Sequence, residues 1–171
     1  MGGHGARHPQ RHAARSGPSA HELWDHYVGR AAHWVGRAWQ AALADLGVGP
    51  TEVHDGPLVC GALGRLVCFG TVGAGEVTVH RSITPGDAGD SGAVGKVVGI
   101  SQRRTRRAAR FQCAAYRCWD AGVLVVLLRL DDDGRGALAE AALGTDRDPG
   151  EMADAFLRHL PDGARALDRL H

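Results

Sequence analysis

The chain has 171 residues, of which 44% are hydrophobic, and a formal net charge of +1 at neutral pH. This length suits one domain with a substantial core, and the near-neutral balance excludes a chain that is polybasic or polyacidic throughout. No run reaches the ~18 apolar residues of a membrane helix, and the N-terminus lacks the apolar segment of a secretory signal. We therefore expect a cytoplasmic protein with no membrane partner.

The N-terminal part divides into a tail and a helix. Residues 1–19 are rich in Gly, His and Arg, which predicts a disordered tail, and one domain is expected over 20–171. Apolar residues at three- and four-residue steps predict a helix over 20–47, which Gly47 would end. Ser19 and Glu22 have the spacing of a capping box at its start.

Short segments with the character of strands follow. They lie at 51–56, 64–72, 75–83, 96–104 and 110–120, and a loop dense in Gly and Asp occupies 84–95. The continuous apolar segment 122–130 predicts a strand buried on both faces. Helices are predicted within 131–144, over 148–160 with Pro149 in the first turn, and at the C-terminus. Helix, sheet and then helices predict an α+β fold with a largely antiparallel sheet.

The four cysteines have no C-x-x-C spacing, so we expect neither a metal site nor a disulfide. Cys68 and Cys113 lie in apolar runs, where a free cysteine usually behaves as a small buried hydrophobe. A reduced intracellular setting is consistent with this pattern.

Lys96 is the only lysine among the 20 Lys and Arg residues of the chain. The two-residue period of a strand predicts Lys96 and Val98 on one face, with Gly99 and Ser101 on the other. Lysine presents a compact ammonium on a slim stem, whereas the planar guanidinium of arginine needs bidentate partners and more room. A glycine inside a strand lets a ligand approach the backbone. These residues favour a site in which one cation bridges a carboxylate and a phosphate; the open alternative is a surface lysine in an arginine-biased chain.

Two longer motifs surround this lysine. VCFGTVGAGEVTV spans 67–79 and GKVVGISQRRTRRAARFQCAAYRCWD spans 95–120, after a Trp-rich helix that ends in AALADLG. In this order they resemble the lipoate–protein ligases of the biotin/lipoate ligase superfamily, specifically the second half of the catalytic domain in the actinobacterial type. The resemblance covers roughly residues 20–160 and implies a partial catalytic domain of the class II synthetase-like fold.

The resemblance also implies an activity. Such ligases use ATP and Mg²⁺ to activate lipoate or octanoate to an acyl-adenylate. They then transfer the acyl group to a lysine of a lipoyl carrier domain, in a 2-oxoacid dehydrogenase subunit or the glycine-cleavage H protein. The invariant lysine of the family falls on Lys96, Gly99 and Ser101 match positions at the activated-acyl site, and Arg103 matches a motif arginine. Glu76 stands where relatives carry an acidic residue near the nucleotide.

The chain also departs from the family. The R-R-x-G-G-G-x-V segment that precedes the helix in relatives has no counterpart in residues 1–20. We therefore expect a sheet that lacks several strands and has an exposed edge, and an activity that needs the missing half, which a separate chain could supply. By itself the chain is expected to form little acyl-adenylate and not to stay monodisperse.

Two other readings remain. One is a catalytically inactive remnant or binding module of the same family. The other is nucleic-acid binding by RRTRRAAR (103–110), which is disfavoured because no aromatic residue is interleaved with these arginines.

Overall fold

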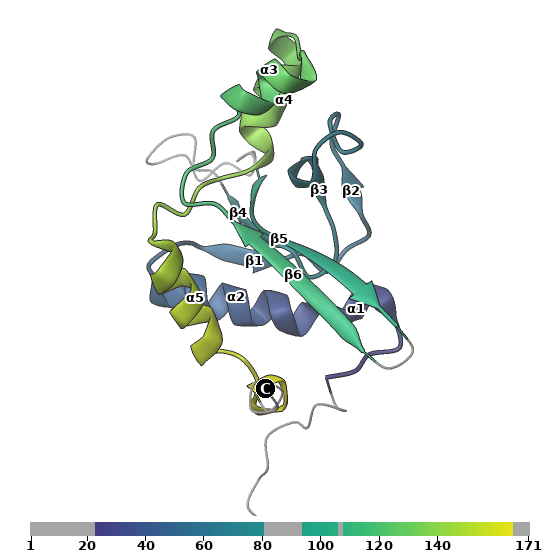
Figure 1. Ribbon diagram of the computed structural model, residues 1–171, viewed down its shortest axis with the longest axis vertical. Helices are drawn as coiled ribbons and strands as arrows, with labels where there is room; N and C mark the ends of the chain where they lie inside the picture. Colours follow the sequence, from purple (N-terminus) through teal and green to yellow (C-terminus); the bar gives the residue numbers. More distant parts are fainter. Residues whose placement is uncertain (1–22, 81–93, 106–107, 166–171) are drawn as a thin grey trace, which may run out of the picture.

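The computed structural model describes residues 23–80, 94–105 and 108–165. They form an α+β fold with a four-stranded antiparallel sheet of order β1-β4-β5-β6 and a separate two-stranded pair β2-β3 (Figure 1). This confirms the predicted class. The helices are α1 (Val28–Ala31), α2 (His33–Asp45), α3 (Gly122–Leu128), α4 (Asp132–Ala141), α5 (Pro149–Arg158) and α6 (Asp162–Arg165), with a 3-10 turn η1 (Cys68–Gly70). The strands are β1 (Thr51–Val53), β2 (Val59–Cys60), β3 (Thr71–Val72), β4 (Val77–His80), β5 (Val94–Arg104) and β6 (Ala109–Ala115).

One face of the four-stranded sheet is covered by α2 and α5 (Figure 1). The core between them contains Leu43 from α2, Val77 and Val98 from the sheet, and Met152 from α5. Trp39 and Phe156 stack at 4.5 Å between ring centroids and join the two helices. Trp39 of the amphipathic helix α2 is thus a core residue.

The first helix begins later than predicted. Leu23–Tyr27 are not helical, because the Asp25 carboxylate accepts the Tyr27 N–H at 2.7 Å and bends the chain before α1. The expected Ser19–Glu22 capping box and most of the 84–95 loop lie outside the described residues. In the described part of the chain, no helix is both long and apolar enough to cross a membrane.

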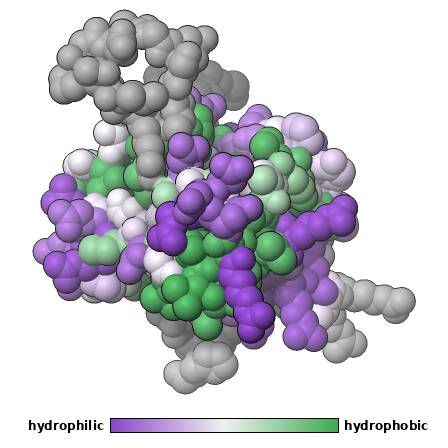
Figure 2. Space-filling model, turned by 90° about the horizontal axis from the view of Figure 1, so that it is seen from above, coloured by the Kyte–Doolittle hydropathy of each residue, from purple (hydrophilic) through white to green (hydrophobic). Residues whose placement is uncertain are grey.

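The prediction of a buried strand at 122–130 is wrong, because this segment forms α3. The Asp120 carboxylate accepts the Gly122 N–H at 2.8 Å, and the helix then ends at Arg129 in the left-handed conformation. Only Val125 of α3 is buried, while Val126 is 76% exposed. An apolar segment without periodicity is compatible with a helix or with a buried strand, and no strand of the described residues pairs with this segment. Figure 2 views the molecule from above, and hydrophobic surface appears there among hydrophilic side chains.

The prediction of one strand over 64–72 is also wrong. Turns and η1 replace most of it, and only β3 remains extended. The Gly61 N–H donates to the Gly70 carbonyl at 3.0 Å, which closes the chain into a compact lobe. The expectation that Cys68 and Cys113 are buried is wrong as well, since η1 and the edge strand β6 leave both residues exposed. All four cysteines are free thiols.

A polar contact joins the C-terminal ends of α2 and α5, and it predicts acid sensitivity. The His159 imidazole lies 2.8 Å from Asp45, and this hydrogen bond lowers the pKa of the Asp45 carboxyl. A carboxyl with a depressed folded-state pKa stabilises the fold above its unfolded pKa of about 3.9, and this stabilisation is lost as the pH falls through the folded value. We expect wild type to exceed Asp45→Asn in urea stability at pH 5, and the gap to close below pH ~4. An unchanged gap down to pH ~2 would contradict this.

Candidate functional site

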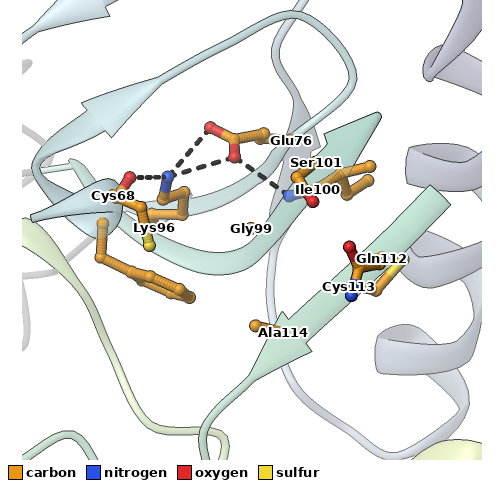
Figure 3. Close-up of a pocket in the computed structure, with 10 residues that line it drawn as sticks. Cys68, Glu76, Lys96, Gly99, Ile100, Ser101, Gln112, Cys113 and Ala114 are labelled. Carbon is orange, nitrogen blue, oxygen red and sulfur yellow. Dashed lines mark hydrogen bonds and ion pairs between the residues drawn. The ribbon is translucent and has the colours of Figure 1, made fainter. Parts of the chain in front are cut away.

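A β-bulge in β5 decides which side chains share the site. Val77 pairs with Val98 and Thr78 pairs with Lys96, so Val97 has no partner in β4. The extra residue shifts the alternation of the strand. Val97 and Val98 therefore both pack into the core against α2. The predicted faces of β5 are wrong for this reason: Lys96, Gly99 and Ser101 all line one cavity (Figure 3).

The ammonium of Lys96 is buried and fully hydrogen-bonded. Its side chain is 1% exposed, and Nζ donates to the Cys68 carbonyl at 2.7 Å and to Glu76 Oε1 and Oε2 at 3.1 and 3.0 Å (Figure 3). Nζ also lies 4.8 Å from the centroid of the Phe69 ring, a cation–π distance. The backbone carbonyl of Lys96 accepts the Leu143 N–H at 3.0 Å, which anchors the strand at this point. Lys96 is therefore not a surface lysine.

Glu76 is the anion that holds this ammonium. Besides Lys96, its Oε2 accepts the Gly73 N–H at 2.8 Å and its Oε1 accepts the Ile100 N–H at 3.0 Å. The pairing of β4 with β5 stops at Val77. The Ile100 N–H therefore donates to the Glu76 carboxylate and not to a backbone carbonyl of β4. These donors satisfy both oxygens of the buried carboxylate. Glu76 thus ties together the turn before β4, the bulged strand and the ammonium.

The cavity has a volume of about 290 Å³ and lies on the sheet face opposite α2. Its rim is formed on β6 by Gln112 and Ala114, which are exposed, so it opens to solvent. The volume is at the lower end of the roughly 300–1,000 Å³ typical of small-molecule sites. A second concavity, at the C-terminal end of α2, has no ionisable side chain in its lining and is not a candidate.

Gly99 brings two side chains of the protein close to β5. A Cβ at Gly99 would lie 3.1 Å from the Phe69 ring and 3.6 Å from Glu76 Oε1. A side chain here would press on the Phe69 ring. Gly99 therefore lets the Phe69 ring and the Glu76 carboxylate approach the strand closely.

Most of the predicted site residues meet in this cavity, and one does not. Lys96, Gly99, Ser101 and Glu76 line it together. Arg103 is absent from the lining and is exposed further along β5. Sequence reasoning missed Phe69 and the Cys68 carbonyl, whose approach depends on the fold of η1. The pairing of Lys96 with Glu76 was missed too, although one unique buried cation needs an anion.

A cysteine nucleophile is not supported. Although Cys113 as a whole residue is exposed, partial desolvation of its thiol group raises the pKa of that thiol, so it stays protonated at neutral pH. The thiolate is the reactive form of cysteine. The chemistry of the site therefore depends on the ammonium.

The described residues do not fit Mg²⁺. No group of three His, Cys, Asp or Glu among them could hold a metal ion. Glu76 contributes the cavity's only carboxylate among the described lining residues, and its oxygens already accept from Lys96, Gly73 and Ile100. Mg²⁺ prefers free carboxylates in addition to phosphate oxygens. The reaction proposed below therefore assigns no role to a metal ion held by these residues.

Comparison with known proteins gives no relative for this chain. No family model matches the sequence, no curated protein matches it, and no solved structure matches the fold. Any functional assignment consequently depends on the residues of the site.

Proposed function

We propose that this chain is a lipoate–protein ligase-like domain whose Lys96 site binds an acyl-adenylate. One observation carries the proposal: a buried ammonium lies in the wall of an open cavity, beside a glycine floor and a serine. A charged group that is desolvated and has a defined partner in a cavity is a candidate functional group. The motif resemblance indicates the reaction in which such a cation would take part, namely the formation and transfer of an acyl-adenylate.

The proposed reaction has two steps. A carboxylate oxygen of lipoate or octanoate attacks the α-phosphorus of ATP, a P–O bond breaks, and pyrophosphate leaves. The neutral amine of a lysine on a lipoyl carrier domain then attacks the acyl carbonyl, AMP leaves with the C–O bond pair, and the amine gives up one proton to solvent as the amide forms. In both steps a cation beside the bridging oxygens stabilises the negative charge that develops there.

The contacts of Lys96 suggest how it would act. Its ammonium has three protons, and two of its contacts go to the same carboxylate. When the ammonium rotates so that it donates to only one Glu76 oxygen, one of its N–H groups becomes available to a substrate oxygen. The hydrogen bond to the Cys68 carbonyl still holds the side chain in place. Ser101 adds a hydroxyl on the same face. Gly99 lines the cavity without adding a side chain to it.

A second function is favoured by the same contacts. Because Cys68 and Glu76 already satisfy the ammonium, a purely structural ion pair in a catalytically inactive member of the family explains the site equally simply. The test must therefore measure ligand binding as well as folding.

Binding of a stable acyl-adenylate analogue, octanoyl-sulfamoyl adenosine, separates the two functions. Glu76→Gln/Lys96→Met removes both charges without leaving either one unpaired. It is expected to bind about 30-fold more weakly than wild type in calorimetric titrations, the equivalent of ~2 kcal/mol for a hydrogen bond to a charged group. Binding does not require the chain to complete the reaction by itself.

Arg37→Met is the control, because it removes one exposed positive charge from α2, which contributes no residue to the cavity lining. It should bind the analogue as wild type does. Equal affinities for wild type and the double variant, or no binding by wild type, would leave the structural ion pair as the better account. ATP–pyrophosphate exchange with lipoate or octanoate then reports whether the chain alone also turns over.

A further inference from the structure

The positive charge of this chain is concentrated on one hairpin. Residues 91–119 contain seven Lys or Arg and no Asp or Glu, in a chain whose net charge is only +1. Acidic residues are therefore in excess elsewhere. The hairpin is formed by β5 and β6 (Figure 1).

Two of these arginines face each other on the open side of the sheet. Arg103 on β5 pairs in register with Arg110 on β6, and both are exposed. They share the face of Ser101 and Gln112, since Phe111, which lies between Arg110 and Gln112, and Ile100, which precedes Ser101, pack against the helical layer. Cβ atoms of directly opposed residues are about 5 Å apart, and like charges at that position destabilise a sheet.

Little in the described chain offsets this repulsion. Arg110 Nη2 donates to the neutral Gln112 Oε1 at 3.4 Å, and no ion pair of Arg103 or Arg110 occurs among the described residues. Arg104 differs, because it points to the helical side and lies 4.4 Å from the Trp24 ring. The pair of arginines on the open face is thus a cationic surface without an anion.

The distance along β5 between Lys96 and Arg103 indicates how large an anion would have to be to contact both residues. Arg103 follows Lys96 by seven residues, which corresponds to about 23 Å of extended chain. No single phosphate held by Lys96 reaches the pair. Neither arginine lines the cavity, and the exposed residues Ser101 and Gln112 connect the cavity rim to the pair.

We propose that Arg103 and Arg110 form a docking surface for an acidic protein segment. A nucleic acid is the less suitable occupant, because Phe111, the one aromatic residue within β5 and β6, packs at 5.4 Å against Trp34 on the helical side and is turned away from the arginine pair. That the partner is the acyl acceptor rests on the proposed function; the docking itself does not. The surface places an acidic partner beside the opening of the Lys96 cavity.

The probe is a fluorescein-labelled glutamate-rich peptide with one central lysine, and its binding to the full chain is measured by anisotropy. Arg103→Gln/Arg110→Gln is expected to weaken binding roughly fivefold at low salt and to flatten its salt dependence. The control Arg37→Gln/Arg135→Gln removes the same charge from exposed helix positions and should bind as wild type does. Glu76→Gln/Lys96→Met should also bind the peptide normally, so a failure of the proposed function does not affect this result.

Three outcomes would overturn the proposal. Equal losses in the Arg37/Arg135 control would show an effect of net charge alone. Tighter binding of a single-stranded oligonucleotide than of the peptide, lost in the Arg103/Arg110 variant, would identify a nucleic-acid surface instead. Loss of acyl-adenylate analogue binding in the Arg103/Arg110 variant, with peptide binding intact, would assign the pair to the nucleotide.

Discussion

Replacing Glu76 with alanine is expected to lower the free energy of unfolding by about 3–5 kcal/mol, because it leaves a buried ammonium without its counter-ion. The Lys96 side chain is 1% exposed and would keep only the Cys68 carbonyl as an acceptor. The N–H groups of Gly73 and Ile100 would lose their acceptor as well. Urea unfolding of Glu76→Ala beside wild type measures the loss.

The double variant Glu76→Gln/Lys96→Met provides the control for this prediction. It removes the charge of both partners, so most of the stability should return, and the coupling between the two sites appears in a double-mutant cycle. A Glu76→Ala protein within ~1 kcal/mol of wild type would mean that Lys96 is neutral or solvated, and the site described above would not exist in solution.

Replacing Gly36 with alanine is expected to cost about 3 kcal/mol, because a side chain there overpacks a backbone contact. A Cβ at Gly36 would overlap the Gly75 carbonyl oxygen and lie 2.9 Å from Val53 Cγ1. Ala32, one helical turn before Gly36, is equally close, since with φ at +88° the Cβ position of Gly75 lies 2.7 Å from Ala32. The turn at Gly75 therefore packs against the backbone of α2 over a full helical turn.

This contact also reaches the site, because Gly75 directly precedes Glu76. A displaced turn moves the carboxylate away from Lys96, so Gly36→Ala should weaken binding of octanoyl-sulfamoyl adenosine in addition to destabilising the fold. Gly136→Ala is the matched control: Gly136 lies in α4, and nothing is within 4 Å of its Cβ position. That variant should be neutral or stabilised by up to ~1 kcal/mol. Equal thermal unfolding of the two variants would argue against the close contact.

The two predictions concern one feature of the fold. A tight approach of α2 to the turn at Gly75 sets the position of Glu76, and Glu76 sets the position of the ammonium. The cavity therefore depends on packing on the opposite side of the sheet. The acyl-adenylate test and the peptide test then ask separately what occupies the cavity and what docks beside it.

Periodicity and turn residues determined much of the fold from sequence alone. The amphipathic step of α2, the apolar positions of α5 and the Pro149 start predicted two helices that the structure contains, and β4, β5 and β6 lie within or close to predicted segments. These signals are local, because side-chain spacing along a helix or strand follows from backbone geometry. The choice of Lys96, Glu76, Gly99 and Ser101 as site residues likewise came from their types and motifs.

Tertiary structure decided what local pattern could not. The apolar run at 122–130 has no period, so only the absence of pairing strands makes it α3. The bulge at Val97 arises from the register between β4 and β5, and it alone brings Lys96 onto the face of Gly99. The pairing of Lys96 with Glu76 across 20 residues and the opposition of Arg103 and Arg110 require the strands to meet. Sequence determined which groups carry charge; the register of the strands determined which of them share a face, because one extra residue in a pleated strand reverses every side chain beyond it.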